Sequence, residues 1–510
     1  MQGMKRLSIG EQEAWYGLCV EDGTALPIVR GSRYRRALTP NGTVNGAAGI
    51  LVSSDGRYLY CEGGAQVCAQ DGVLEMASPD AEVFVGEGHG TLRGAWAALV
   101  RERLPAGRAM PPALFFTAPQ YNTWIELMYR QSQQGVLEYA RAILANGYPP
   151  GILMIDDGWM RDYGVWEFVP DTFPDPRGMV QQLHGLGFRV MLWVSPFISP
   201  DSPVFRALLP TAALLRGADG KIAVREWWNG YSAVLDLSSA EAMAWLHSQL
   251  DSLAKRYGVD GFKLDGGDAK FYRDDDQTTG GVSANAQSTL WAKAGLRYPY
   301  NEYRACYGMA NAPLVHRLAD KKHSWDGQGM GSLVPNTLTQ GMLGYAFGCP
   351  DMIGGGEYAN FMENSASLDA ELFVRYAQCA ALMPMMQFSA APWRVLAPEH
   401  AALCLQAARL RAQFADRILA LADHAAQTGE PIVRYLEYSF PHQGLAAVRD
   451  QFMLGDDVLV APVVKKGARE RSVVLPAGEW RYVDGAVYAG GATVTVAAGL
   501  ETLPYFMRLA

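Results

Sequence analysis

Four charged side chains, Asp260, Lys263, Asp265 and Asp268, fall within one short run of this chain, YGVDGFKLDGGD (257–268). The apolar residues of this run predict the end of a helix and then a short buried strand over 261–264. Because side chains alternate along a strand, Lys263 and Asp265 share one face, where the lysine charge favours the ionised form of Asp265. An ionised carboxylate at a strand end suits a nucleophile, and Asp268 follows as a second acid. The alternative is a surface turn rich in glycine and aspartate.

A partner carboxylate is predicted in the run RLADKKHSWDGQGMGSL (317–333). There the ring of Trp325 can desolvate Asp326 and raise its pKa, and the glycines let a substrate approach closely. Two acids flanking a sugar ring can hydrolyse a glycosidic bond, one by attacking the anomeric carbon and the other by protonating the leaving oxygen. An Asp-Gly turn is the alternative for Asp326. Asp351, in GCPDMIGGG, is more typical of a structural acid at a strand end.

Alternating strands and helices supply the scaffold for these acids. Strands are predicted in ALFFTAP (113–119), GILMIDDGW (151–159) and FRVMLWVSPF (188–197), and helices over 136–145, 179–184 and 241–255. This alternation is typical of a parallel α/β barrel, in which all strand ends meet in one bowl. The polar and aromatic residues at the predicted strand ends are Asp156, Asp157, Trp159, Trp193, Asp265 and Asp268.

The chain has 510 residues, which is too long for one ordinary domain. Its first part shows short apolar runs separated by turn dipeptides such as Asp55-Gly56 and Asp71-Gly72, and strands return near the end, as in VLVAPVV (458–464). We therefore predict an α/β fold with three parts. These are an N-terminal β-sandwich domain (1–112), a catalytic (β/α)8 TIM barrel (113–422) and one or more C-terminal β-sandwich domains (423–510).

Composition argues against several classes of function. The net charge of −8 leaves no basic stripe for nucleic acid. No apolar stretch reaches about 18 residues and the first residues lack the apolar run of a signal peptide, so we expect a cytoplasmic protein that does not enter a membrane. The seven scattered cysteines predict buried thiols. Since the eight histidines are dispersed and no phosphate loop, dinucleotide fingerprint or serine elbow occurs, we expect no cofactor and no metal.

Several motifs, in the same order along the chain, resemble glycoside hydrolase family 31. Lys263-Leu264-Asp265 resembles the nucleophile motif of that family, and Asp351-Met352-Ile353-Gly354-Gly355 resembles its late-strand signature. The runs WWNGYSAVLDLSSAEAMAW (227–245) and DQFMLGDDVLVAPVV (450–464) are also similar to family sequences. Within the family, the similarity is strongest to the branch of myogenesis-regulating glycosidase and its bacterial relatives, which is associated with α-galactosidase activity.

The resemblance implies a role for each matching residue. It implies that Asp265 is the nucleophile and Asp326 the general acid/base, and that Asp156 binds sugar hydroxyls. The predicted substrate-binding residues are Asp156, Asp157, Trp159, Trp193, Trp228, Lys263, Asp268, Arg317 and Trp325.

Two departures from the wider family bear on the sugar. Where the α-glucosidases of the family carry Arg-Asn-His, this chain has Gln387-Phe388-Ser389. Where the family's acid/base motif is Trp-x-Gly-Asp, this chain has Ser324-Trp325-Asp326-Gly327, so the register of that motif is open to within a residue or two. Both departures favour the galactosidase-associated branch.

We therefore expect a retaining exo-α-glycosidase that acts on terminal α-galactosides, with a small glycoside or oligosaccharide as its binding partner. The same mechanism on α-glucosides, α-xylosides, α-N-acetylgalactosaminides or sulfoquinovosides is the first alternative. A barrel that binds carbohydrate without cleaving it is the second, and a metal-dependent barrel enzyme is the third. A homo-oligomer is compatible with this size and architecture.

Overall fold

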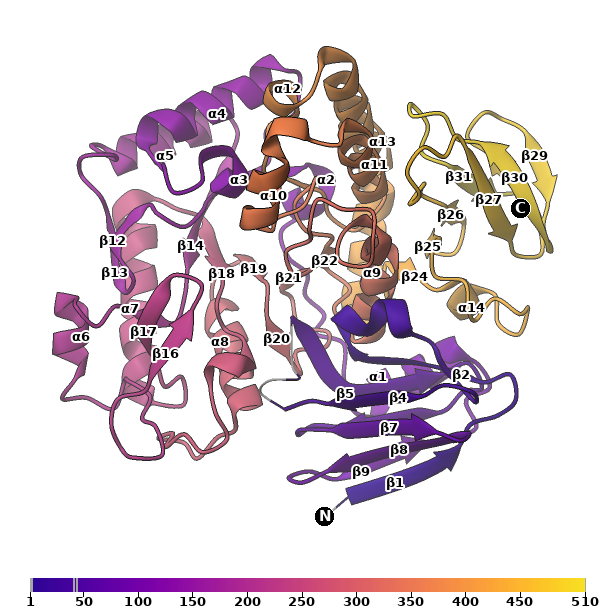
Figure 1. The fold of residues 1–510 in the computed structure, drawn as a ribbon, viewed down its shortest axis with the longest axis horizontal. Helices are drawn as coiled ribbons and strands as arrows, with labels where there is room; N and C mark the ends of the chain where they lie inside the picture. Colours follow the sequence, from indigo (N-terminus) through magenta and orange to yellow (C-terminus); the bar gives the residue numbers. More distant parts are fainter. Residues whose placement is uncertain (1–2, 40–41, 43–44, 510) are drawn as a thin grey trace.

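The computed structural model describes residues 3–39, 42 and 45–509. Figure 1 shows a central barrel, a layered β region formed by the start of the chain, and a small β domain at the C-terminal end. One hydrophobic core runs through all three parts and includes Tyr16, Trp96 and Phe452 together with the barrel residues. Because this core is continuous, the flanking parts are packed onto the barrel rather than tethered to it.

Eight parallel strands form the barrel within the described part of the chain. In their register Trp193 pairs with Lys263, and Lys263 pairs with Glu302. A single bridge between Met352 and Gln387 nearly closes the ring. The predicted α/β barrel is therefore confirmed. Its strands are β10 (Gln120–Asn122), β11 (Ile152–Ile155), β14 (Arg189–Val194), β18 (Gly261–Leu264), β19 (Tyr300–Tyr303), β21 (Val315–Arg317), β22 (Gly348–Cys349) and β23 (Gln387–Phe388).

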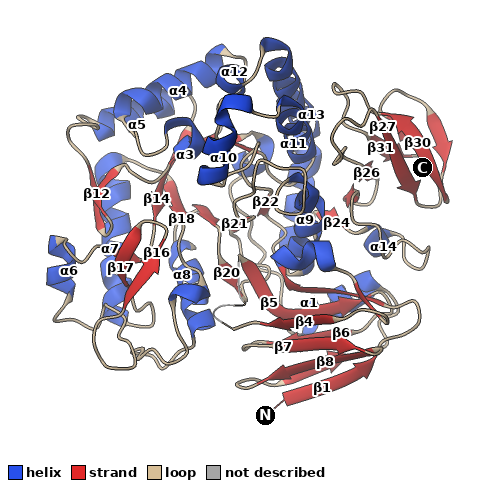
Figure 2. Ribbon diagram, in the orientation of Figure 1, coloured by secondary structure: helices blue, strands red, loops and turns tan. Residues whose placement is uncertain are grey.

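Helices cover the outside of these strands, as Figure 2 shows. They are α4 (Gln133–Ala145), α5 (Pro176–Gly185), α7 (Ala240–Tyr257), α8 (Ala284–Gly295), α9 (Leu333–Met342), α11 (Ala370–Ala381) and α13 (Pro398–Thr428). The short α3 (Thr123–Leu127) follows β10 at the barrel mouth. Smaller elements extend the loops at the barrel mouth or beside it. These are β12 (Met160–Asp162), β13 (Val165–Phe168), β15 (Phe197–Ile198), α6 (Pro203–Leu208), β16 (Val224–Trp227), β17 (Gly230–Val234), η2 (Ala269–Phe271), η3 (Met330–Ser332), α10 (Tyr358–Asn364), η4 (Ser365–Ser367) and α12 (Pro392–Val395).

One predicted strand is wrong. The apolar run 113–119 forms the short helix α2 (Leu114–Thr117), and the first barrel strand is β10, which begins at Gln120. Phe115 and Phe116 are nevertheless fully buried, and α2 packs against α13. A short apolar run is buried as either a strand or a helix, so periodicity alone does not separate the two.

Glycines set the start of the strand that leads to Asp265. Helix α7 begins at the cap Ser239, whose side chain accepts a hydrogen bond from the backbone of Ala242, and ends at Gly258 in the left-handed conformation (φ 83°). The strand β18 starts three residues later at Gly261. A Cβ there would lie 1.8 Å from the carbonyl oxygen of Tyr300, so only glycine lets β18 and β19 pair this closely.

The flanking regions are mainly β structure. The N-terminal region comprises β1 (Gly3–Ser8), β2 (Ala14–Cys19), η1 (Val20–Ala25), β3 (Ile28–Val29), β4 (Tyr34–Ala37), β5 (Gly46–Ser53), β6 (Tyr58–Cys61), β7 (Gln66–Gln70), β8 (Val73–Ser78), β9 (Val83–Gly86) and α1 (Leu92–Glu102). The C-terminal domain comprises β24 (Val433–Arg434), α14 (Leu436–Ser439), β25 (Phe452–Leu454), β26 (Val458–Val460), β27 (Glu470–Leu475), β28 (Glu479–Tyr482), β29 (Val487–Ala489), β30 (Ala492–Ala497) and β31 (Tyr505–Arg508). None of the helices in the described ranges has the length and apolar character that crossing a bilayer requires.

The barrel and the N-terminal region share a strand pairing. The strand β20 (Cys306–Tyr307), in the segment after β19, pairs in parallel with β5 through Cys306 with Gly46 and Tyr307 with Ala47. The segment that follows the carboxyl end of β19 is therefore part of the N-terminal sheet.

Candidate active site

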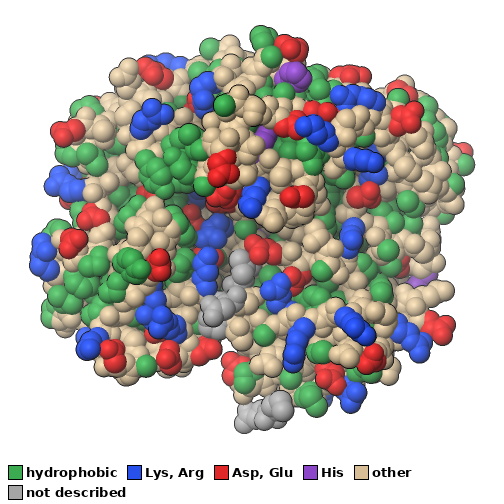
Figure 3. All heavy atoms as spheres, viewed as in Figure 1, with side chains coloured by type: hydrophobic (Ala, Val, Ile, Leu, Met, Phe, Trp, Pro, Cys, Tyr) green, Lys and Arg blue, Asp and Glu red, His purple; other side chains and the backbone are tan. Residues whose placement is uncertain are grey.

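A cavity of about 530 Å³ opens at the carboxyl ends of the barrel strands. Figure 3 shows that this face of the molecule is hollowed near its centre, where acidic, basic and hydrophobic side chains meet. The charged residues of the cavity include Asp156, Asp157, Lys263, Asp265, Arg304 and Asp320. Its aromatic residues are Trp124, Tyr129, Trp193, Trp228 and Tyr358. They come from separate strands and loops, as expected for the active-site face of an α/β barrel.

Asp265 lies at the floor of this cavity, directly after β18, and is only 8% exposed. Its carboxylate accepts hydrogen bonds from Trp193 Nε1 (2.9 Å), Arg304 Nε (2.9 Å) and the backbone N–H of Gly266 (2.9 Å). The other nitrogens of Arg304 donate to Asp268, so the guanidinium bridges the two acids. Asp265 is therefore held in one orientation by donors from three strands or strand ends.

The charge state of Asp265 follows from opposing effects. Burial by itself raises the pKa of this carboxyl group, but the positive charges of Arg304, Lys263 and Arg317 and the hydrogen bond from Trp193 outweigh burial. The pKa of Asp265 is held well below its usual range. The group is therefore an ionised carboxylate at any pH near neutrality.

A buried ion pair stands next to Asp265. Lys263 Nζ donates to Asp156 Oδ2 at 2.6 Å, and both side chains are almost fully buried. Burial lowers the pKa of Lys263, but the charge of Asp156 outweighs burial and the pKa is raised. Lys263 thus carries a positive charge that acts on Asp265 without a direct ion pair between the two.

Asp157 has a different environment. Its Oδ2 accepts hydrogen bonds from Asn229 Nδ2 (2.7 Å) and from the Tyr163 hydroxyl (3.1 Å). Burial, and then the charge of Asp156, raise the pKa of Asp157 to about 7. Asp156 and Asp157 are adjacent in the chain, but their carboxyl groups have different electrostatic environments. Asp156 is paired with Lys263, and Asp157 is hydrogen-bonded to neutral groups.

Asp320 supplies a further carboxylate to the cavity, from the loop after β21. Its side chain is 37% exposed and accepts a hydrogen bond from Arg317 Nη1 at 2.6 Å. The same guanidinium donates to the buried Asp351 at 2.5 Å, which agrees with the structural role expected for that acid. Asp320 is thus oriented by a buried arginine and still accessible from the cavity.

The structure brings only part of the predicted site together. Asp156, Asp157, Trp193, Trp228, Lys263 and Asp265 line the cavity. Trp159, Asp268 and Arg317 are buried behind it, where they contact Trp193, Arg304 and Asp320 respectively. Trp325 lies outside the lining and donates through its Nε1 to Asp369 at 3.0 Å.

Asp326 is exposed and is not part of the cavity lining. Its Oδ1 accepts hydrogen bonds from the Ser324 hydroxyl (2.7 Å) and the backbone N–H of Gln328 (2.9 Å). The Ser324 hydrogen bond is the main cause of a lowered pKa for Asp326. Asp326 therefore lies in an exposed turn, which was the alternative that the sequence left open. Trp325 does not desolvate Asp326 as we expected.

Several cavity residues were missed by sequence reasoning, above all Arg304 and Asp320. Arg304 follows β19 in the run YNEYRACYG, and a polar run at a strand end was the signal that could have found it. Asp320 stands three residues after Arg317, in the same run as Asp326. The choice between the two acids depended on the path of a loop, which the sequence does not reveal.

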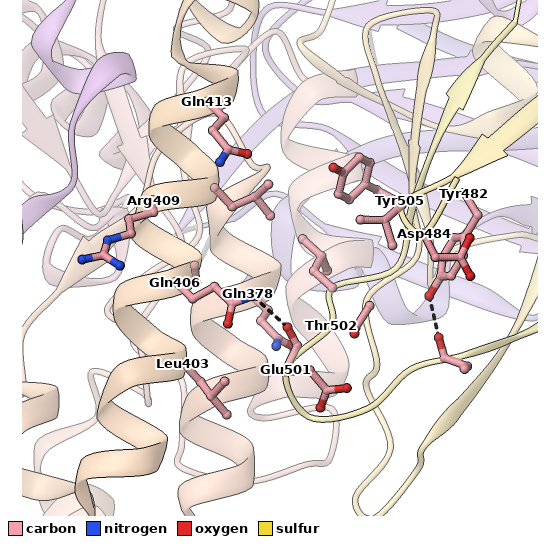
Figure 4. A pocket seen from close by; sticks show the side chains of 15 residues that line it. Gln378, Leu403, Gln406, Arg409, Gln413, Tyr482, Asp484, Glu501, Thr502 and Tyr505 are labelled. Atoms are coloured by element: carbon pink, nitrogen blue, oxygen red, sulfur yellow. Dashed lines mark hydrogen bonds between the residues drawn. The ribbon is translucent and has the colours of Figure 1, made fainter. Parts of the chain in front are cut away.

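A second cavity, of about 560 Å³, lies between α13 and the C-terminal strands (Figure 4). Its acidic side chains, Asp484 and Glu501, are exposed, and Gln406 and Gln378 bond to backbone carbonyls of the C-terminal domain. A catalytic carboxylate needs a fixed orientation and a tuned pKa. In the barrel cavity, Asp265 meets both conditions. Across the described ranges, no group of three or more His, Cys, Asp or Glu side chains is placed to hold a metal ion.

Comparison with known proteins finds family 31 domains over most of the chain. The model of the glycosyl hydrolases family 31 TIM-barrel domain matches residues 108–421, and that of the family 31 C-terminal domain matches residues 429–509. The chain is 35% identical over 402 residues to myogenesis-regulating glycosidase from Mus musculus, covering 76% of this chain and 56% of that protein. It is 27% identical over 413 residues to a 1,3-alpha-isomaltosidase from Kribbella flavida, covering 74% and 54%.

Solved structures agree on the fold. A family 31 dextranase from Flavobacterium johnsoniae, in complex with glucose, superposes with a TM-score of 0.85 over 100% of this chain and 67% of its own, at 21% identity. The chain spans about half the length of the curated relatives that it matches. The family models cover the barrel that carries the cavity and the domain that follows it. The chain therefore belongs to glycoside hydrolase family 31.

Proposed function

We propose that this glycoside hydrolase is a retaining exo-α-glycosidase for terminal α-galactosides, and that Asp265 and Asp320 carry the reaction. The observation that carries the proposal is the pair of carboxylates on one cavity, one buried and ionised and the other accessible. Two such groups are what a retaining glycosidase needs on either side of the bond that it cleaves.

Asp265 is suited to attack the anomeric carbon because it is ionised and held in place by Trp193 and Arg304. Attack forms the bond between its oxygen and C1 and breaks the bond from C1 to the leaving oxygen, which takes a proton from Asp320. Asp320 then removes a proton from water, and the water oxygen displaces Asp265 from C1. Two inversions at C1 return the α configuration.

We assign the acid/base role to Asp320 rather than to Asp326, which the sequence favoured. An acid/base must reach the leaving oxygen within hydrogen-bond distance, and then reach a water. Asp320 lines the cavity and its side chain is partly exposed, whereas Asp326 faces solvent outside it.

The choice of galactose rests on the sequence motifs and on one buried residue. Gln387 is the first residue of the segment Gln387-Phe388-Ser389, which stands where the α-glucosidases of the family carry Arg-Asn-His. Its amide donates to Glu302 Oε2 (2.8 Å) and to Gln120 Oε1 (2.9 Å), so it is committed to the barrel interior and does not line the cavity. The relatives also include an Alpha-glucosidase 2, alpha-xylosidases and a sulfoquinovosidase, and those sugars are the alternatives to test.

A panel of aryl α-glycosides of galactose, glucose, xylose, N-acetylgalactosamine and sulfoquinovose tests the proposal, with the anomer of the first product read by NMR. We expect cleavage of the α-galactoside with release of α-galactose. Asp265→Asn should lower kcat/KM on the order of a thousandfold. Asp320→Asn should lose most activity on poor leaving groups, and azide should restore turnover only of substrates with good leaving groups, because it attacks the glycosyl-enzyme without a general base. The matched control Asp326→Asn should retain wild-type activity.

Every other outcome would contradict one specific part of the proposal. Cleavage of a different sugar overturns the choice of galactose and leaves the mechanism standing. Loss of activity in Asp326→Asn but not in Asp320→Asn returns the acid/base role to Asp326. A β product excludes retention, and no cleavage of any member of the panel overturns the hydrolase proposal.

A further inference from the structure

We propose that three aromatic rings at the cavity mouth form an aglycone subsite that selects leaving groups with a flat apolar ring. The three residues, Trp124, Tyr129 and Tyr358, are called the aromatic collar. This inference rests on the proposed function, because an aglycone exists only if the cavity cleaves a glycoside. It adds the chemical class of the leaving group.

The rings of the collar pack against one another as one surface. The centroids of Trp124 and Tyr129 lie 5.3 Å apart, those of Trp124 and Tyr358 also 5.3 Å, and those of Tyr129 and Tyr358 5.5 Å. They come from α3, from the loop that follows it and from the start of α10. All three rings line the same cavity as Asp265 and Asp320.

Exposure places Asp265 at the floor of the cavity and the collar nearer its mouth. Asp265 is 8% exposed and Trp193 is 1% exposed, whereas Tyr129 is 48% exposed and Trp124 and Tyr358 are partly exposed. Partly exposed aromatic rings that gather in a cavity mark a surface for an apolar partner. A sugar whose anomeric carbon meets Asp265 must project its leaving group outward, because the floor is closed by the barrel. The collar lies on that outward path.

Hydrogen bonds hold the collar in position without a ligand. Trp124 Nε1 donates to the carbonyl of Gly356 at 3.1 Å. The Tyr129 hydroxyl donates to Asn229 Oδ1 at 3.1 Å, and Asn229 lies in the turn between β16 and β17. The rings are therefore preorganised, which lowers the entropic cost of binding a rigid partner.

The chemistry of this surface defines its ligand. Aromatic faces attract flat apolar rings, such as the carbon face of a second pyranose or an aryl group, and gain little from a methyl group or a single atom. A substrate with a ring-bearing leaving group should therefore use the collar. A glycosyl fluoride carries no aglycone and cannot use it.

The experiment compares kcat/KM for three α-galactosides: a disaccharide, the 4-nitrophenyl glycoside and the fluoride. We expect Tyr129→Ala and Tyr358→Ala each to lower kcat/KM about tenfold for the two ring-bearing substrates and less than about twofold for the fluoride. Tyr129→Phe keeps the ring and loses only the hydroxyl bond to Asn229, so it should lower kcat/KM for the ring-bearing substrates less than Tyr129→Ala does. A loss confined to the disaccharide identifies a pyranose as the partner, and a loss confined to the 4-nitrophenyl glycoside identifies an aryl group.

Met362→Ala is the matched control, because Met362 is exposed on α10 but does not line the cavity. It should leave all three rates unchanged. If Tyr129→Ala and Tyr358→Ala lower the rates for the fluoride and the ring-bearing substrates equally, the collar is only structural and the inference is overturned. If the wild type hydrolyses no glycosyl fluoride of any sugar in the panel, the proposed function itself fails.

Discussion

The ionised state of Asp265 depends on positive charges that converge from different strands. Arg304 follows β19, Lys263 lies on β18 and Arg317 ends β21. Each of these side chains is also paired with another acid: Asp268, Asp156 and Asp351 respectively. The site thus offsets each buried positive charge with an acid, and Asp265 remains ionised beside Arg304. Asp157 stands outside this balance, since no basic side chain pairs with it in the described structure.

Asp157 therefore predicts a pH-dependent stability. Its pKa is raised to about 7 in the folded protein, so folding favours its protonated form. The stabilisation that results is fully present below the unfolded pKa of about 4 and is lost as the pH rises through 7. Asp157→Asn stays neutral at every pH. The free energy of unfolding of this variant, relative to wild type, should rise by about 2–3 kcal/mol between pH 5 and pH 8.

Chemical denaturation at several pH values measures this difference. Asp326→Asn is the control, because Asp326 is exposed and its pKa is lowered, so it stays ionised across the same range. Its offset from wild type should not change between pH 5 and pH 8. A flat offset for Asp157→Asn as well would show that Asp157 is ionised throughout.

At the scale of elements, the loop between β18 and η2 positions Asp265 by tight packing. Gly267 lies against the indole of Trp291 on α8, and a Cβ on it would approach Trp291 Cδ1 to 2.0 Å. Trp291 is fully buried, so neither partner can yield without moving the loop or the helix. The backbone that carries the nucleophile is thus set by contact with a neighbouring helix.

Gly267→Ala should therefore damage both stability and catalysis. We expect a loss of about 1–3 kcal/mol in the free energy of unfolding, the usual cost of overpacking, and at least a tenfold loss in kcat because Asp265 is displaced. Gly185→Ala, on α5, is the control, since a Cβ there meets nothing within 4 Å. Thermal unfolding and steady-state kinetics measure the two effects. Full activity in Gly267→Ala would mean that the loop position does not govern the nucleophile.

Elements also show where sequence reasoning succeeds and fails. The strand over 261–264 was predicted with its exact bounds, because a helix end, a glycine and an apolar run mark it. The helix α2 was predicted as a strand, because its four residues are too few to show a period. Arg304 was missed and Asp320 was passed over for Asp326, because which side chains of a loop turn inward depends on contacts made by other strands. The local sequence pattern was sufficient to locate β18. Tertiary packing decides which loop side chains line the cavity, and the sequence pattern does not reveal it.

At the scale of the whole molecule, the side chain of Asn45 links the N-terminal region to the active site. Asn45 Nδ2 donates to the backbone carbonyl of Arg304 at 2.5 Å and to that of Arg317 at 3.0 Å. Those two arginines contact Asp265 and Asp320, the proposed catalytic pair. Asn45 has a left-handed backbone conformation (φ 57°), which asparagine tolerates better than most residues. One amide therefore ties a flanking domain to both charge-bearing strand ends.

Removing this amide should weaken catalysis more than it weakens folding. Asn45→Gly keeps the left-handed backbone and deletes both hydrogen bonds, so we expect kcat to fall about tenfold or more as Arg304 and Arg317 lose their support.

Asn285→Ala is the matched control, because Asn285 Nδ2 also joins the barrel to the N-terminal region, through the carbonyl of Leu38 at 2.8 Å, but does not contact the arginines. Both variants should lower Tm, Asn45→Gly somewhat more because it loses two side-chain hydrogen bonds to backbone carbonyls and Asn285→Ala loses one. If kcat falls equally in both variants, the N-terminal region supports the barrel only by packing. A loss of kcat confined to Asn45→Gly would show that the N-terminal region helps to position the catalytic residues.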